Sequence, residues 1–150
     1  MYSKYILALL TGLFLLSCND DESTDTTRPE IEILTPADDS HFHAGDSFEL
    51  RAQLSDNEAL ASWKVDVHFN GGEGHTHKSS STEDTAVEWE AEWTGDLAGS
   101  ETSFLLEQTI EIPANAEHGE YHLVVMALDR QGNETTAYSS FEVEAEDHQH

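Results

Sequence analysis

The feature that most constrains the fold is a repeated alternation of hydrophobic and polar residues between Glu30 and Val143. A period of two places every second side chain on the same face of a β-strand, whereas a helix requires a period near 3.6. Gly, Pro, Asn and Asp residues separate the alternating segments, and no segment has convincing helical periodicity. The pattern therefore predicts an all-β domain.

About seven strands are expected on this basis. Their segments are 31–33, 48–54, 63–69, 87–93, 104–112, 121–128 and 135–143. Short strands with turn residues between them are typical of an immunoglobulin-like antiparallel β-sandwich. The fourth segment corresponds to strand D of that fold, or to strand C′ as the alternative. Residues 70–84 lack hydrophobic side chains and predict a loop.

The first 17 residues predict a signal peptide, because Lys4 precedes a short hydrophobic run that is too short to span a bilayer comfortably. The run ends in Leu15-Leu16-Ser17-Cys18, which resembles a bacterial lipobox. The resemblance implies that Cys18 carries lipid, with a plain secretory signal as the alternative. Since Cys18 is the only cysteine, neither an intramolecular disulfide nor a Cys-based zinc site is expected.

The predicted organisation has four parts. They are a signal peptide at 1–17, a lipidated cysteine with an acidic, Thr-rich tether at 18–28, an immunoglobulin-like domain at 29–146 and a His-containing tail at 147–150. The cluster Asn19-Asp20-Asp21-Glu22 resembles the export signal of outer-membrane lipoproteins in Bacteroidota. Lipid anchoring to the outer membrane follows, at either the cell surface or the periplasmic face.

The charge balance excludes several classes of partner. Lys and Arg total 6 against 31 Asp and Glu, which gives a formal net charge of -25. This surface repels nucleic acid and cannot dock on an anionic membrane through a basic patch. Membrane contact is therefore expected through the lipid anchor only. Cations, by contrast, are attracted.

Residues 119–133 resemble the F strand and F–G turn of bacterial immunoglobulin-like domains. That resemblance implies a tyrosine corner at Tyr121, with Leu123, Val125 and Ala127 in the core. Together with the lipobox, His41-Phe42-His43 and the loop histidines, it extends to a family of small Bacteroidota lipoproteins. Members have an immunoglobulin-like, His-rich domain of unknown function, so the resemblance implies a fold but no activity.

Histidine is the unusual component, with nine residues in the chain. Three pairs have His-x-His spacing, namely His41 with His43, His75 with His77, and His148 with His150, while His68, His118 and His122 are single. Residues i and i+2 of a strand share a face about 6.6–7 Å apart. The strand order of an immunoglobulin-like sandwich brings all nine to one pole.

The strands that carry His68 and His122 are antiparallel neighbours in this fold, and both side chains should point outward. Cross-strand neighbours have Cβ atoms about 4.5–5.5 Å apart, which lets two imidazoles share one ion. His75 and His77, on a Gly-rich loop, are expected to supply further ligands. His41 and His43 are the next candidates and the terminal pair the last. Imidazole favours zinc or copper over calcium and magnesium. The alternative is that exposed histidines have no function.

Other chemistry is less well supported. Asp56, Asn57, Glu58, Asp129 and Asn133 place oxygen ligands at the opposite pole, but Asp and Asn also satisfy the backbone of turns, so the sequence disfavours calcium. Phosphate-loop, Gly-x-Ser-x-Gly and His-Glu-x-x-His motifs are absent from the sequence.

The sequence thus favours a non-enzymatic, lipid-anchored protein that binds zinc or copper for capture or hand-over, beside an outer-membrane transporter or another surface partner. The main alternative is an adhesion or accessory module for a protein or glycan, with incidental histidines. An exposed aromatic patch around Trp89 and Trp93 would support that alternative. A metal-dependent hydrolase is a third hypothesis, although nothing specifies a substrate cleft.

Overall fold

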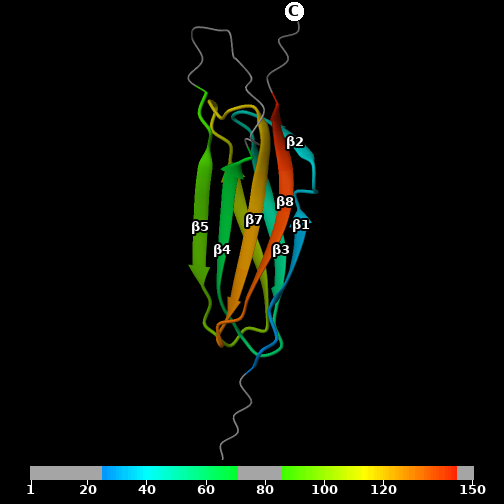
Figure 1. Cartoon of the computed structure of the whole chain (residues 1–150), viewed down its shortest axis with the longest axis vertical. Coiled ribbons are helices and arrows are strands. Elements are labelled where there is room, and N and C mark those ends of the chain that lie inside the picture. The colour runs from blue at the N-terminus through cyan, green and yellow to red at the C-terminus, as the bar shows by residue number, and fades with distance from the viewer. Residues whose placement is uncertain (1–24, 71–85, 145–150) are drawn as a thin grey trace, which may run out of the picture.

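The structure is a computed structural model that describes residues 25–70 and 86–144. Eight strands make up its regular structure: β1 (Glu30–Thr35), β2 (Ser40–His43), β3 (Ser47–Ser55), β4 (Leu60–Phe69), β5 (Glu90–Asp96), β6 (Ser103–Glu111), β7 (Gly119–Asp129) and β8 (Glu134–Glu144). They form a three-stranded sheet, β1-β3-β6, and a five-stranded sheet, β2-β8-β7-β4-β5 (Figure 1). The predicted immunoglobulin-like β-sandwich is confirmed. Within the described ranges, no helix is long and hydrophobic enough to cross a bilayer.

Two strands differ from the simplest prediction. The fourth predicted strand, β5, pairs with β4 at the edge of the five-stranded sheet, which is the C′ position. It begins at Glu90, because Val87 makes only an isolated bridge to Ala116 and is 53% exposed. The sequence also missed β2, a four-residue strand that lies parallel to β8 and directs only Phe42 toward the core.

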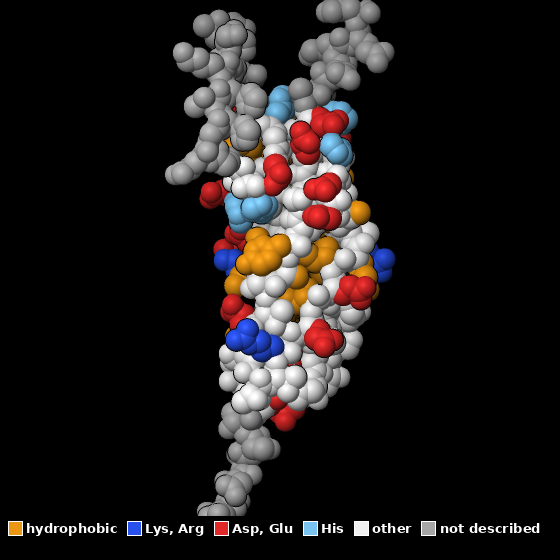
Figure 2. Space-filling view, turned by 45° about the vertical axis from the view of Figure 1, so that its right-hand side comes forward, with side chains coloured by type: hydrophobic (Ala, Val, Ile, Leu, Met, Phe, Trp, Pro, Cys, Tyr) orange, Lys and Arg blue, Asp and Glu red, His pale blue; other side chains and the backbone are white. Residues whose placement is uncertain are grey.

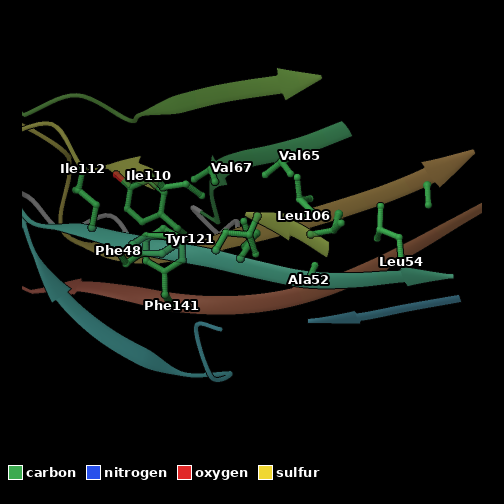
Figure 3. Packing of buried hydrophobic residues seen from close by; sticks show 14 of the residues in the cluster. Phe48, Ala52, Leu54, Val65, Val67, Leu106, Ile110, Ile112, Tyr121 and Phe141 are labelled. Carbon is green, nitrogen blue, oxygen red and sulfur yellow. The ribbon is translucent and has the colours of Figure 1, made fainter. Parts of the chain in front are cut away.

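The inward residues of both sheets form one continuous core. Leu50, Leu54, Val65, Ile110 and Leu123 are fully buried. Figure 3 shows an aromatic group at one end of this core and aliphatic side chains farther along it. In the aromatic group, the Tyr121 and Phe141 rings stack with centroids 5.5 Å apart. Alternate residues of β3, β4 and β7 enter the core, so their other residues must face outward.

Tyr121 forms the predicted tyrosine corner. Its hydroxyl donates a hydrogen bond to the carbonyl oxygen of Glu117 at 2.8 Å, and the residue is fully buried. Burial raises the pKa of the Tyr121 phenol. Leu123, Val125 and Ala127 also lie in the core, as the resemblance implied.

The sandwich has two poles. At the histidine pole, β4 and β8 end, β7 begins and β2 lies alongside β8; at the turn pole, the β3–β4 and β7–β8 connections meet (Figure 1). All histidines in the described part of the chain occupy the histidine pole, namely His41, His43, His68, His118 and His122. Because both sheets and the core lie within residues 25–144, a chain that starts at Ser23 retains the complete sandwich.

Candidate metal-binding site

His68 of β4 and His122 of β7 are direct cross-strand partners. Their ring centroids are 5.4 Å apart, and the rings are nearly perpendicular at 84°. Both side chains point outward from the five-stranded sheet and are partly exposed, at 38% and 39%. The geometric prediction for this pair is therefore confirmed, whereas its use as a metal site stays a prediction.

Each histidine of the pair follows an acidic residue two positions earlier. His68 Nδ1 lies 2.6 Å from Asp66 Oδ1, and His122 Nε2 lies 3.5 Å from Glu120 Oε1. Since the strands are antiparallel, the two carboxylates flank the pair from opposite sides. A third carboxylate, Glu90 of β5, is the register partner of His68.

The contact with Asp66 fixes the protonation pattern of the neutral His68 ring. An ionised carboxylate can only accept a hydrogen bond, so Nδ1 carries the proton and donates it to Asp66. Nε2 then keeps its lone pair and faces away from Asp66. This carboxylate–histidine arrangement is the one that orients metal-binding imidazoles in proteins.

Glu120 is itself held in place, since Asn70 Nδ2 donates a hydrogen bond to Glu120 Oε1. The sequence did not single out Asp66, Glu120 or Asn70, because carboxylates are so abundant in this chain that no pair is distinctive. The usable signal was the matching Asp-x-His and Glu-x-His spacing on two strands predicted to be neighbours.

A second histidine cluster lies on β2 and β8. His41 pairs in register with Glu142, and His43 with Glu144. His41 Nδ1 lies 2.8 Å from Glu144 Oε1, and His43 Nε2 lies 3.9 Å from Glu144 Oε2. Three strand spacings of about 4.8 Å separate β2 from β4, so one ion cannot bridge His41 or His43 to His68.

Two hollows lie between these clusters on the outer face. One, of about 350 Å³, includes Glu120, His122 and Tyr138, and the other, of about 210 Å³, includes Glu120 and His41. Figure 2 shows histidine and acidic side chains on the upper half of this face, above a hydrophobic patch. The negative potential of this half attracts cations.

The described histidines offer pairs of metal ligands, but they do not form a site of three or more ligands. Among residues 25–70 and 86–144, no group of three that includes a histidine has its ligand atoms within 4.8 Å of one another. His75, His77, the terminal histidines and Cys18 lie outside the described residues. His118 is exposed at the same pole, in the connection before β7.

The exposed aromatic patch around Trp89 and Trp93 that would have supported the adhesion alternative is not present. Trp89 and Trp93 are partly buried and pack against the core, and Trp89 lies 5.8 Å from the Tyr121 ring. Core packing therefore accounts for both tryptophans. The exposed aromatic side chain that the sequence missed is Tyr138, which is 72% exposed on the outer face of β8.

A family model described as "Domain of unknown function (DUF4625)" matches residues 16–144, a range that includes every strand. The chain belongs to the DUF4625 family. No curated protein matches the sequence. Because the family is described as one of unknown function, the match assigns no activity to the domain.

The solved structures that resemble this DUF4625 domain are distant in sequence. Fibronectin(III)-like modules of Clostridium thermocellum CbhA have 13% identity and a TM-score of 0.47, covering 82% of this chain and 50% of theirs. Wild-type OgpA from Akkermansia muciniphila has 13% identity and a TM-score of 0.51, covering 81% and 30%. Catalytically inactive OgpA with an O-glycopeptide substrate has 12% identity and a TM-score of 0.50, covering 86% and 33%.

The chain thus spans half or less of the length of these structures. At such identities the two OgpA comparisons support the β-sandwich fold alone.

Proposed function

We propose that this DUF4625 domain is a non-enzymatic binding module that takes up a transition-metal ion, zinc or copper, on the outer face of its five-stranded sheet. The observation that carries the proposal is the cross-strand pair of His68 and His122, with Asp66 on Nδ1 of His68. Two imidazoles at this spacing, oriented by carboxylates, match the ligand preference of both metals.

The exposure of the pair supports capture and hand-over. Both rings are more than one-third exposed, so an ion can enter and leave without opening the sandwich. Water, Glu90 or Glu120 completes the coordination in this proposal, and the sequence adds His75 and His77. In this proposal the domain passes its ion to a transporter or another surface partner, and the lipid on Cys18 is its anchor.

Calorimetric titration of the chain from Ser23 with zinc and with copper tests the proposal. We expect micromolar or tighter, stoichiometric binding that His68→Ala/His122→Ala weakens at least tenfold. The matched control, His41→Ala/His43→Ala, removes two imidazoles at the same pole and should retain the affinity. Asp66→Ala should weaken binding about 10–100-fold, because it releases the orientation of His68.

Two results would overturn the metal proposal. One is weak binding that the His68→Ala/His122→Ala variant shares with the parent chain. The other is affinity that does not change between pH 7.5 and pH 5, because protons compete with the metal ion for imidazole nitrogens in acid.

A second candidate function rests on Tyr138. Its exposed ring borders the hollow of the outer face that also contains Glu120 and His122, a combination that suits a protein or glycan partner. In this case a glycan array should detect binding that Tyr138→Ser abolishes and His68→Ala/His122→Ala preserves. The opposite pattern favours the metal-binding role, and no binding to the array would contradict a glycan partner.

The anchor is tested separately in cells that express the full chain. We expect labelled palmitate to be incorporated into the parent protein and not into Cys18→Ser, with the parent in the membrane fraction and the variant released. Equal labelling of the two chains would contradict lipidation at Cys18.

A further inference from the structure

Three aspartates from distant parts of the chain converge at the turn pole. Asp25 precedes β1, Asp56 follows β3, and Asp129 ends β7. One carboxylate oxygen from each lies within 4.8 Å of the other two, and this is the only such group of metal-ligand side chains in the described ranges. Figure 1 shows the start of the described chain and both turns at this end of the sandwich.

Most oxygens of the cluster have the turn-capping role that the sequence predicted. Asp129 Oδ1 accepts hydrogen bonds from the backbone N–H groups of Gln131 and Asn133, at 2.9 and 2.7 Å. Asp56 Oδ2 accepts from the N–H groups of Glu58 and Ala59. Asp25 Oδ1 accepts a hydrogen bond from Thr27 N–H at 2.9 Å. Turn capping therefore explains one side of each carboxylate.

Two oxygens are left over. Asp25 Oδ2 and Asp56 Oδ1 are buried and lack a hydrogen-bond partner, and no other side-chain oxygen or nitrogen in the described part of the chain has this status. The Asp25 side chain is buried although the residue as a whole is partly exposed, and Asp129 is 2% exposed. A buried carboxylate oxygen without a partner is unfavourable unless a cation or donor meets it.

No basic side chain offsets the three charges. The ion pairs found in the described ranges do not involve these aspartates. Arg130, next to Asp129 in sequence, directs its guanidinium to the Gly99 carbonyl instead. Lys, Arg and His side chains therefore make no ion pair with these three carboxylates in the described ranges.

We infer that the turn pole binds a calcium ion through Asp25, Asp56 and Asp129. Carboxylate oxygens are hard ligands, and calcium accepts six to eight oxygens at about 2.3–2.6 Å, so ligands on opposite sides of the ion lie about 4.6–5.2 Å apart. The three carboxylate oxygens lie within 4.8 Å of one another, which is close enough for one ion to bind all three. Magnesium demands strict octahedral geometry and usually keeps several water ligands, so three protein carboxylates from separate segments suit calcium better.

The ion would fix the segment before β1 to the domain. Asn133 Nδ2 already donates a hydrogen bond to the Asp25 carbonyl at 3.1 Å, so residue 25 lies against the β7–β8 turn. The sequence assigned residues 18–28 to the tether and gave no sign of this contact. Calcium would therefore stabilise the sandwich and set the direction in which the preceding chain leaves it.

Thermal unfolding and calorimetry of the chain from Ser23 test this inference with calcium, magnesium and zinc as separate probes. We expect calcium to raise Tm relative to EDTA, with a smaller effect of magnesium. Asp25→Asn should weaken calcium binding at least tenfold. In EDTA it should leave Tm nearly unchanged, because the Asn amide oxygen can still accept the hydrogen bond from the Thr27 N–H.

The control variant is Glu58→Gln, which neutralises an exposed carboxylate in the same turn and should keep the full calcium response. Because Asn at position 25 keeps an oxygen that can accept from Thr27 N–H, and Asp56 and Asp129 are unchanged, a folding defect should not obscure the outcome. Zinc binding should persist in Asp25→Asn and be weakened at least tenfold in His68→Ala/His122→Ala, so each site can be disrupted without affecting the other. No calcium binding at millimolar concentration, or an unchanged response in Asp25→Asn, would overturn the calcium site.

Discussion

At the scale of single residues, the Tyr121 hydroxyl makes a specific stabilising contact with the Glu117 carbonyl. Tyr121→Phe should lower the free energy of unfolding by roughly 1–2 kcal/mol, because it removes the hydroxyl donor to Glu117 O and leaves the core packing intact. Urea unfolding measures the loss. Tyr138→Phe is the matched control, since that ring is 72% exposed, and should change stability by less than about 0.5 kcal/mol. Equal effects of the two changes would contradict a tyrosine corner.

The sequence located some site residues and missed others for a physical reason. His68 and His122 were predictable because antiparallel adjacency follows from the strand order, and rare residues stand out. Asp66 and Glu120 were not, because their role depends on side-chain rotamers among many similar carboxylates. The place of Asp25 at the turn pole could not be predicted, because it depends on a contact with Asn133, which is far away in the sequence.

At the scale of elements, the strands that were predicted are those with long alternation and one buried face, such as β3 and β7. The short strand β2 depends on tertiary contacts instead. Asp38, just before it, accepts hydrogen bonds from Ser140 N and Oγ of β8 at 2.7 and 3.1 Å. These hydrogen bonds hold the segment before β2 against the edge of the five-stranded sheet.

The hydrogen bonds between Ser140 and Asp38 predict that the stability of the fold depends on pH. The Ser140 backbone hydrogen bond holds the pKa of the Asp38 carboxyl below its usual value, so the ionised form stabilises the fold. That contribution is complete above about pH 4 and is lost as the pH falls through the lowered pKa. Asp38→Asn should therefore lower Tm at pH 7, with a difference that shrinks toward pH 3.

Asp96→Asn, on the exposed edge strand β5, serves as the control for Asp38→Asn and should leave Tm nearly unchanged at both pH values. A Tm difference between the parent and Asp38→Asn that is constant from pH 7 to pH 3 would show that ionisation of Asp38 does not contribute.

At the scale of the whole molecule, the sandwich separates two kinds of ligand. Imidazoles gather at the histidine pole, and hard oxygen ligands converge at the turn pole. The fold explains the separation, because connections from alternate strands meet at opposite ends. A transition metal and calcium would thus bind without competing. The transition metal would exchange at the exposed histidine pole, and calcium would stabilise the turn pole near the tether.

The most direct test of the central claim is anomalous diffraction at the zinc edge from crystals of the chain from Ser23 grown with zinc. The account predicts a peak about 2.0–2.1 Å from a ring nitrogen of both His68 and His122, with the His68 contact through Nε2. A peak elsewhere, or none at this pair while the protein is saturated in solution, would contradict metal binding on this face.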